Sequence, residues 1–196
     1  MSRIGRQAIP LPSGVKVAPG GGMVQVSGPL GQIELAIDRR LRVTVDAAKA
    51  CVRVERADDD RQTRALHGLT RNLIVNMIVG VTRGYVKGIQ VVGVGYSAKV
   101  EGTELVLQVG YHNDLHVPIP KGLSIDPPAT GNLMVSGVGS VPCATVRIRG
   151  VDKQKVGEFA AEVRRLKPPE PYRGKGIRYE GEEVRRKAGK AFAAQE

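Results

Sequence analysis

The sequence predicts an α+β protein with two tandem similar domains, each an antiparallel sheet packed against one long helix, and a basic irregular C-terminal arm. Short runs with apolar residues at every second position are separated by turn residues, which indicates half-buried antiparallel strands. A segment with apolar spacings of three and four residues follows these runs, and this spacing is typical of a helix. The pattern then repeats in the second half of the chain.

In the first half, four alternating runs rich in valine and isoleucine are the expected strands: residues 23–28, 32–37, 41–46 and 51–56. A helix of about 20 residues follows and ends near residues 80–84. Asp58–Asp60 supply its N-cap and complement its positive end. The spacing of leucine and methionine predicts the stripe that faces the core. It consists of Leu66, Leu69, Leu73 and Met77, and it is flanked by Ile74, Ile78 and Val81.

The second half repeats this plan with a growing offset. Residues 96–110 resemble 23–37 at an offset of about 74, whereas 146–154 resemble 52–60 at an offset of about 94. The second copy therefore holds additional residues within 129–145, where an extra hairpin is one interpretation and the strand register stays open. A second helix is capped by Asp152, is stopped by Pro168 and Pro169, and buries one face, namely Val156, Phe159, Ala160 and Val163.

These patterns predict three parts. Residues 1–82 form an N-terminal α+β domain that starts with a short basic arm at 1–20, residues 83–170 form a C-terminal α+β domain, and residues 171–196 form the basic C-terminal arm.

Charge limits the classes of partner. The chain has 30 Lys and Arg against 19 Asp and Glu, a net charge of +11. This excess favours a polyanionic partner, nucleic acid first and an anionic membrane surface second. The start lacks a continuous apolar region and no long apolar window follows, so we expect a cytoplasmic protein. Cys51 and Cys143 are expected to be buried thiols.

A catalytic or metal constellation is not evident. His112 and His116 are four residues apart, but Asn-Asp and two prolines place them in a turn entering a strand, where this spacing does not converge side chains. The glycines of 93–96 precede another strand rather than the helix that a dinucleotide loop requires. His67 is expected to be a packed or surface histidine. We therefore expect no enzyme, no metal and no cofactor.

The segment 164–190 carries ten basic residues against four acids. Its prolines and glycines make it a poor helix and a poor strand, and its glycines allow close approach to a sugar-phosphate surface. Tyr172 and Tyr179 offer flat faces for unstacked bases. Binding by phosphate neutralisation and shape is expected, and replacing Arg173, Lys175 and Arg178 by Ala should weaken it without disturbing the fold.

Four segments in the same order resemble the bacterial large-subunit ribosomal protein L-six family. They are "MSRIGRQAIPLPSGV", "RALHGLTRNLIVNMIVGVTRGYVKGIQVVGVGYSAKV", "GVDKQKVGEFAAEVRRLK" and "PPEPYRGKGIRYEGEEVRRKAGK". The resemblance implies a non-enzymatic large-subunit protein in the cytoplasm. It implies binding to 23S rRNA beside the sarcin–ricin region, near the stalk base and its neighbouring proteins, where elongation factors dock. The family usually has fewer residues where this chain has 131–145.

The resemblance places the rRNA contacts largely in the second domain and the arm. Together with the charge pattern, it points to one set of candidate rRNA-binding residues: Lys153, Lys155, Arg164, Lys167, Tyr172, Arg173, Lys175, Arg178, Tyr179, Arg185, Arg186 and Lys187. Lys153 and Lys155 stand at a helix N-terminus, whose free N–H groups also favour phosphate.

Three alternatives remain open at the level of sequence. A free-standing protein could bind another folded RNA away from ribosomes. An RNA-modifying enzyme could use His112, Asp114 and His116. A basic protein could lie on an anionic membrane, which requires an amphipathic helix with a cationic face.

Overall fold

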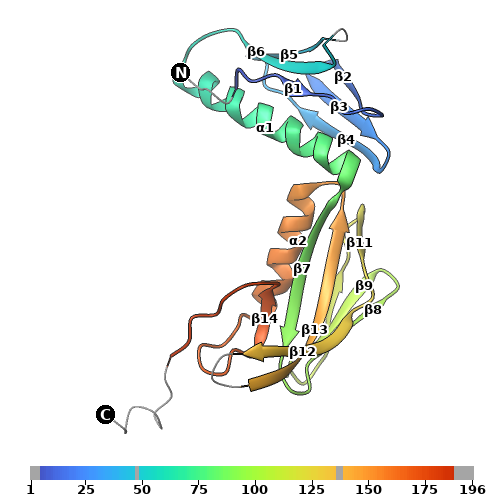
Figure 1. The fold of residues 1–196 in the computed structure, drawn as a ribbon, viewed down its shortest axis with the longest axis vertical. Coiled ribbons are helices and arrows are strands. Elements are labelled where there is room, and N and C mark those ends of the chain that lie inside the picture. The colour runs from blue at the N-terminus through green and yellow to red at the C-terminus, as the bar shows by residue number, and fades with distance from the viewer. Residues whose placement is uncertain (1–4, 47–48, 136–138, 188–196) are drawn as a thin grey trace. The chain divides into compact units, whose positions relative to one another are not determined.

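The computed structural model describes residues 5–46, 49–135 and 139–187. It divides into two compact units. Unit 1 is the described part of Met1–Tyr85 together with Val151–Lys153, and unit 2 is Val86–Gly150 with the described part of Gln154–Glu196. Each unit combines antiparallel strands with one helix, so the predicted α+β class is confirmed (Figure 1).

Unit 1 distributes its strands over two three-stranded sheets, ordered β2-β3-β4 and β1-β6-β5. Neighbouring strands in both sheets are antiparallel. Of the four strands that the sequence predicts here, β3, β5 and β6 have the predicted bounds and β4 is shifted by one residue. The bounds are β1 Ile9–Pro10, β2 Lys16–Gly20, β3 Met23–Gly28, β4 Gly31–Ala36, β5 Leu41–Asp46 and β6 Cys51–Arg56.

The N-terminal segment is not simply an arm. Residues 9–10 and 16–20, which the sequence places in a basic arm, form β1 and β2. Both strands lie at sheet edges, where proline is tolerated because no partner needs its missing N–H. Burial explains the pairing, since Ile9 is buried in the unit 1 core. Residues 1–4 of the predicted arm lie outside the described residues.

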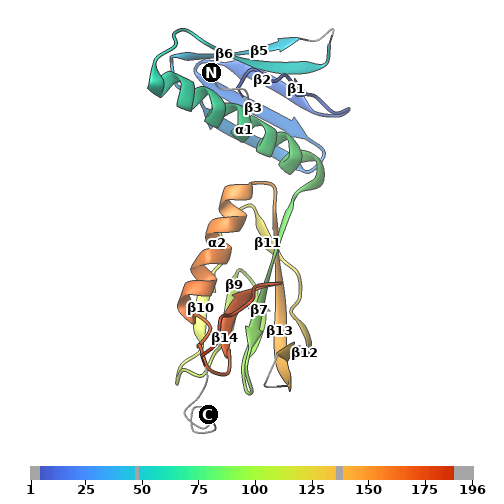
Figure 2. The same ribbon diagram turned by 60° about the vertical axis from the view of Figure 1, so that its left-hand side comes forward.

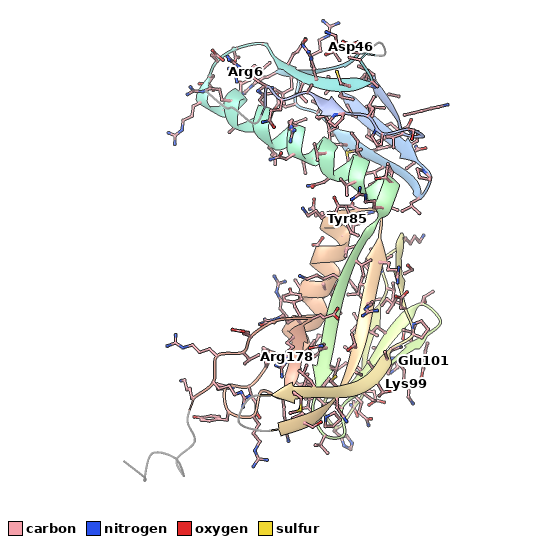
Figure 3. All side chains as sticks on the ribbon, in the orientation of Figure 1. Arg6, Asp46, Tyr85, Lys99, Glu101 and Arg178 are labelled. Atoms are coloured by element: carbon pink, nitrogen blue, oxygen red, sulfur yellow. The ribbon has the colours of Figure 1, made fainter. Side chains whose placement is uncertain are left out.

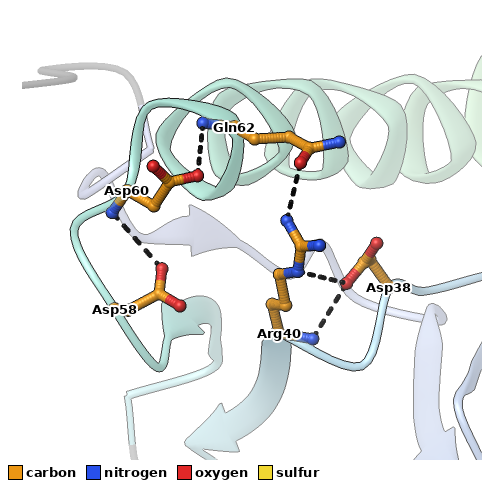
Figure 4. Close-up of polar contacts among 5 residues, drawn as sticks. All are labelled: Asp38, Arg40, Asp58, Asp60 and Gln62. Atoms are coloured by element: carbon orange, nitrogen blue, oxygen red, sulfur yellow. Dashed lines mark hydrogen bonds and ion pairs between the residues drawn. The ribbon is translucent and has the colours of Figure 1, made fainter.

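Helix α1, Arg61–Arg83, begins at the predicted cap. The Asp60 carboxylate accepts a hydrogen bond from the Gln62 N–H at 3.1 Å, and Arg40 donates to the Gln62 side chain at 2.9 Å (Figure 4). The helix ends at Gly84, whose φ of 72° is one that glycine adopts readily. Both ends therefore agree with the sequence.

The buried face of α1 is rotated from the predicted one. The leucine stripe is wrong in part, because Leu69 is 53% exposed. The buried positions begin with Thr63, His67 and Thr70 and continue with Ile74, Met77, Ile78 and Val81. His67 fits there because its Nε2 lies 2.8 Å from the Val54 carbonyl oxygen, so of the two predicted alternatives, packed or surface, the structure has the packed one. The α1 stripe packs against strands of both unit 1 sheets.

Unit 2 also has two sheets. One has the order β10-β9-β8, and the other has the path β11-β13-β7-β14, with β12 paired to β13. The bounds are β7 Tyr85–Val92, β8 Ser97–Glu101, β9 Glu104–Gln108, β10 Leu115–Pro118, β11 Leu123–Ile125, β12 Ala129–Val135, β13 Gly139–Gly150 and β14 Gly176–Tyr179.

The segment 129–145 forms an extra hairpin, as one of the sequence interpretations has it. Strand β12 pairs with the first half of β13, from Ala129↔Thr145 to Val135↔Gly139. The second half of β13 pairs with β11 through Ile125↔Ile148. The register conflict is thereby resolved, because one long strand of 12 residues serves both partners. Residues 136–138 of the predicted additional segment lie outside the described residues.

Helix α2, Lys153–Leu166, starts directly after Asp152 and ends before the two prolines, as predicted. It buries Val156, Phe159, Ala160 and Val163, which is the predicted face. Two views show α2 lying alongside β7 and β14 of the larger sheet (Figures 1 and 2). The larger sheet of unit 2 thus has one face that lies against the helix and one that does not.

Both cysteines are buried free thiols, as predicted. Neither helix, within the described ranges, combines the length and apolar character needed to cross a bilayer.

Candidate nucleic-acid interface

The basic arm begins where α2 ends and folds back onto the sheet. Residues 167–175 form a loop that is closed by a hydrogen bond from the Glu170 N–H to the Lys175 carbonyl at 2.9 Å. The chain then forms β14, which pairs antiparallel with β7 from Gly176↔Val92 to Tyr179↔Ile89. We call residues 171–175 the presenting loop and residues 176–182 the anchoring segment.

The sequence expectation of a wholly irregular arm is wrong for β14. Glycine weakens a strand by entropy, but here Ile177 is fully buried and its N–H donates to the Lys167 carbonyl at 2.7 Å. Gly176 has a φ of 137°, and a Cβ there would stand 2.7 Å from the Pro168 carbonyl oxygen. Glycine is therefore needed for the chain to turn into β14 beneath the prolines.

An ion pair ties the anchoring segment to helix α2. The Arg164 guanidinium donates through Nε to Glu182 Oε2 at 3.0 Å and through Nη2 to Glu182 Oε1. The Tyr179 N–H donates to the same carboxylate at 2.9 Å. The pKa of Glu182 is lowered, first by the hydrogen bonds from Arg164, and the pKa of Arg164 is raised by the same contact. Arg164 is thus engaged within unit 2.

Arg178 is buried, with 6% of its surface exposed, although the sequence places it outside the core (Figure 3). Its Nη2 donates to the Gly174 carbonyl at 2.8 Å. The pKa of Arg178 is lowered, chiefly by burial and next by the positive charge of Arg186. The expectation that its replacement leaves the fold undisturbed therefore rests on a wrong premise, since it shares the packed region with Ile177.

The two tyrosines of the arm differ in their surroundings. Two cations contact the Tyr179 ring: Lys87 Nζ lies 4.6 Å and the Arg164 guanidinium carbon 5.5 Å from its centroid. Tyr172, in the presenting loop, is 55% exposed. Of the two, only the Tyr172 ring has a face available for stacking on a base without rearrangement.

The remaining candidate cations differ in exposure. Lys167 is half-buried, with its Nζ 4.2 Å from the Tyr111 ring centroid. Lys153 belongs to unit 1, where its Nζ lies 3.4 Å from the Asn76 side-chain oxygen. The exposed members in unit 2 are Lys155, Arg173, Arg185 and Lys187, and the half-buried ones are Lys175 and Arg186. Residues 188–196 of the predicted arm lie outside the described residues.

The contact between Lys87 and the Tyr179 ring is one that the sequence pattern does not reveal. It lies on β7, whose alternation shows which positions share a face but not which strand pairs beside it. Pairing with β14 brings Lys87 to Tyr179, and the ring and cation then share one site. No other feature of the sequence marks Lys87, a basic residue within a strand, as a partner of the arm.

The histidines do not converge on a common site. His116 Nδ1 lies 3.1 Å from Glu104 Oε2 across β9 and β10, and His112 is exposed in the preceding turn. Within the described ranges, no group of three or more His, Cys, Asp or Glu side chains is arranged to hold a metal ion.

Comparison with known proteins adds the decisive observation. A family model for ribosomal protein L6 matches residues 11–84 and 141–180, more than half of the chain. The chain belongs to the ribosomal protein L6 family. The gap in the match, 85–140, contains β12, so the extra hairpin starts in the part that the family model does not match.

Relatives match nearly the whole chain. The large ribosomal subunit protein uL6 of Rubrobacter xylanophilus is 46% identical over 97% of this chain and 99% of its own length. The uL6 proteins of Carboxydothermus hydrogenoformans and Rhodopirellula baltica are 46% and 44% identical, each over 97% of this chain. The L6 family consists of structural, non-enzymatic ribosomal proteins, so the resemblance and the prediction of no enzyme are confirmed.

Proposed function

We propose that the chain is a structural constituent of the large ribosomal subunit and binds 23S rRNA through phosphate and shape contacts. The observation that carries this proposal is the L6 match over both halves of the chain, together with relatives named as large-subunit proteins. The net charge of +11 agrees with a polyanionic partner.

The presenting loop is the main proposed contact. Arg173 is exposed and Lys175 half-exposed on a loop closed by the Glu170–Lys175 hydrogen bond. The loop backbone that carries the two cations is thus held in place before binding, which reduces the backbone conformational entropy lost when they meet phosphates. Arginine can donate two parallel hydrogen bonds to one phosphate, and each neutralised phosphate releases counterions.

The start of α2 is a second proposed contact. Lys155 is exposed in the first turn, where the free backbone N–H groups of a helix N-terminus favour negative charge. Arg185 and Lys187, exposed beyond the anchoring segment, extend the proposed surface. The C-terminal domain, taken as 83–170, and the arm therefore carry most of the proposed rRNA contacts.

The family resemblance supports a proposed place on the ribosome. We place the contact beside the sarcin–ricin region, near the stalk base, in the cytoplasmic ribosome. Neighbouring large-subunit proteins and, transiently, elongation factors would then be partners. A hydroxyl-radical footprint of the bound protein on 23S rRNA would test this placement.

Sedimentation of a lysate through sucrose gradients at low and high salt tests the function itself. We expect the protein to migrate with the large subunit and to remain there at high salt. Residence at the top of the gradient at both salt concentrations would contradict the proposal and favour a free-standing RNA-binding protein.

A further inference from the structure

The turn that follows β7 lies beside the presenting loop. In the antiparallel β7–β14 pair, Val92 stands opposite Gly176. The chain that leaves β7 at residue 93 therefore meets the chain that enters β14 from Lys175. Residues 93–96, whose glycines do not make a dinucleotide loop, form this turn between β7 and β8. Strand pairing thus brings the turn and the arm together, although they are about 80 residues apart in the chain.

Backbone hydrogen bonds fix the turn. The Gly93 N–H donates to the Pro142 carbonyl at 3.1 Å, and the Tyr96 N–H donates to the Gly93 carbonyl at 3.2 Å. Val94 stands between these two donors with 72% of its surface exposed. The backbone of Val94 therefore has a fixed place beside β13, the second strand of the extra hairpin.

A small groove lies between the turn, β13 and the presenting loop. Its volume is about 180 Å³. The turn and β13 supply its apolar lining, and the loop supplies two cations; the lining residues are Val94, Ser140, Val141, Pro142, Arg173 and Lys175. This volume is smaller than that of pockets that enclose a whole small ligand, so the groove suits one part of a larger molecule.

Both cations of the groove are available to a partner. Among the described residues, neither the Arg173 side chain nor the Lys175 side chain has a hydrogen bond, an ion pair or a ring contact. None of the lining residues is acidic. A single exposed valine is ordinary on a protein surface, but Val94 borders a groove with two uncompensated positive charges. This combination favours a partner that has an anionic part and an apolar part.

A nucleotide in a nucleic-acid chain has both parts. Its phosphate oxygens match the donors of the Arg173 guanidinium and the Lys175 ammonium group. The flat face of its base can pack on apolar side chains such as valine and proline. A base reaches such a groove only when it is unpaired and turned out of its stack.

We propose that this groove holds the base of one unpaired rRNA nucleotide against Val94 and Pro142, while Arg173 and Lys175 bind its phosphate. This inference rests on the proposed rRNA binding and deepens it. It adds an apolar contact from outside the arm, makes β13 of the extra hairpin part of the binding surface, and specifies an unpaired nucleotide.

Filter binding of the full chain to transcribed large-subunit rRNA over a salt series separates the two kinds of contact. Val94→Asn removes apolar surface and leaves the charge unchanged, so it should weaken binding about fivefold without changing the salt slope. Lys175→Gln should reduce the slope by about one. Val86→Asn makes the same change at a 52% exposed position of unit 2 that does not line the groove, and it should bind like the parent.

The outcomes separate this inference from the proposed function. If the parent binds rRNA and Val94→Asn binds equally well, the groove holds no base. An unchanged slope in Lys175→Gln would contradict the phosphate contact. If the parent does not bind rRNA at all, the proposed function fails and this inference falls with it.

A crosslink identifies the class of partner. Cys51 and Cys143 are buried, so a photoactivatable thiol label attaches to Val94→Cys in the folded protein. In assembled large subunits this label should crosslink to an unpaired nucleotide of 23S rRNA, and the same label on Val86→Cys should not reach that nucleotide. A crosslink from Val94→Cys to a neighbouring protein alone would overturn the RNA assignment.

Discussion

Two segments of the basic arm are alike in composition and differ in their surroundings. Tyr172 and Arg173, in the presenting loop, are exposed. Arg178 and Tyr179, in the anchoring segment, are buried or covered by Lys87 and Arg164. The difference arises from strand pairing, because β14 joins β7 and both of its faces are covered: Ile177 and Arg178 are buried although neighbouring side chains of a strand point to opposite faces. Basic charge in a segment therefore does not by itself show which residues meet a partner.

The largest effect is expected where the loop turns into the strand. Gly176→Ala places a Cβ against Pro168 and forces a non-glycine residue to a φ of 137°, so it should destabilise unit 2 by about 3 kcal/mol. Chemical denaturation followed by hydrogen exchange at β7 measures this loss.

Gly157→Ala is the matched control, because it lies in α2 with no atom within 4 Å of the added Cβ. It should stabilise the helix by about 0.5–1 kcal/mol. Equal stability changes for the two glycine variants would contradict the steric account of Gly176.

The next effect concerns the ion pair that holds the anchoring segment. Glu182→Gln should lower the free energy of unfolding by about 1.5 kcal/mol at pH 7. The folded-state pKa of Glu182 is lowered, so the carboxylate stabilises the fold above its ordinary pKa of 4.5. This contribution is lost as the pH falls through the folded-state pKa.

The parent and Glu182→Gln should therefore unfold with the same free energy at low pH. Urea titrations at pH 7 and at a pH below the folded-state pKa make the comparison. A difference that persists unchanged at low pH would show that the contact with Arg164 acts through packing and not through charge.

The presenting loop should affect binding and leave stability unchanged. Replacing both Arg173 and Lys175 by Ala should reduce the slope of log affinity against log salt by about one for each lost phosphate contact. Filter binding on large-subunit rRNA measures the slope, and thermal melting checks the fold. Arg178→Ala is the contrasting variant, since its side chain is buried and its loss should lower the melting temperature. An unchanged slope in the double variant would remove the loop from the rRNA contact.

The smallest effect is expected from the tyrosines. Tyr172→Ala should weaken rRNA binding about fivefold if its exposed ring stacks on a base, with stability unchanged. Tyr179→Ala should instead lower stability, because Lys87 and Arg164 lose the ring that they contact. The rRNA affinity and the melting temperature of both variants check this. Lost stability in Tyr172→Ala together with lost affinity alone in Tyr179→Ala would contradict the two roles.

Local pattern was sufficient for much of the fold. Period-two alternation located β3, β5 and β6 at their observed bounds, and Asp60 and Gly84 mark the ends of α1 as capping chemistry requires. The buried face of α2 also followed from spacing alone. These features depend on neighbours within a few residues, so the sequence contains them directly.

The sequence by itself determined the α+β class, the strongly basic surface and the L6 family, because alternation, charge and motif order are properties of the chain. The tertiary structure decided which cations face outward. Glycines and prolines predicted an irregular arm, yet the unpaired edge of β7 and a buried site for Ile177 stabilise β14. The rotated face of α1 has the same origin, since His67 is buried by its contact with Val54 on a distant strand. Long-range pairing and burial outweigh local propensity in both places, and neither can be read from residues adjacent in the chain.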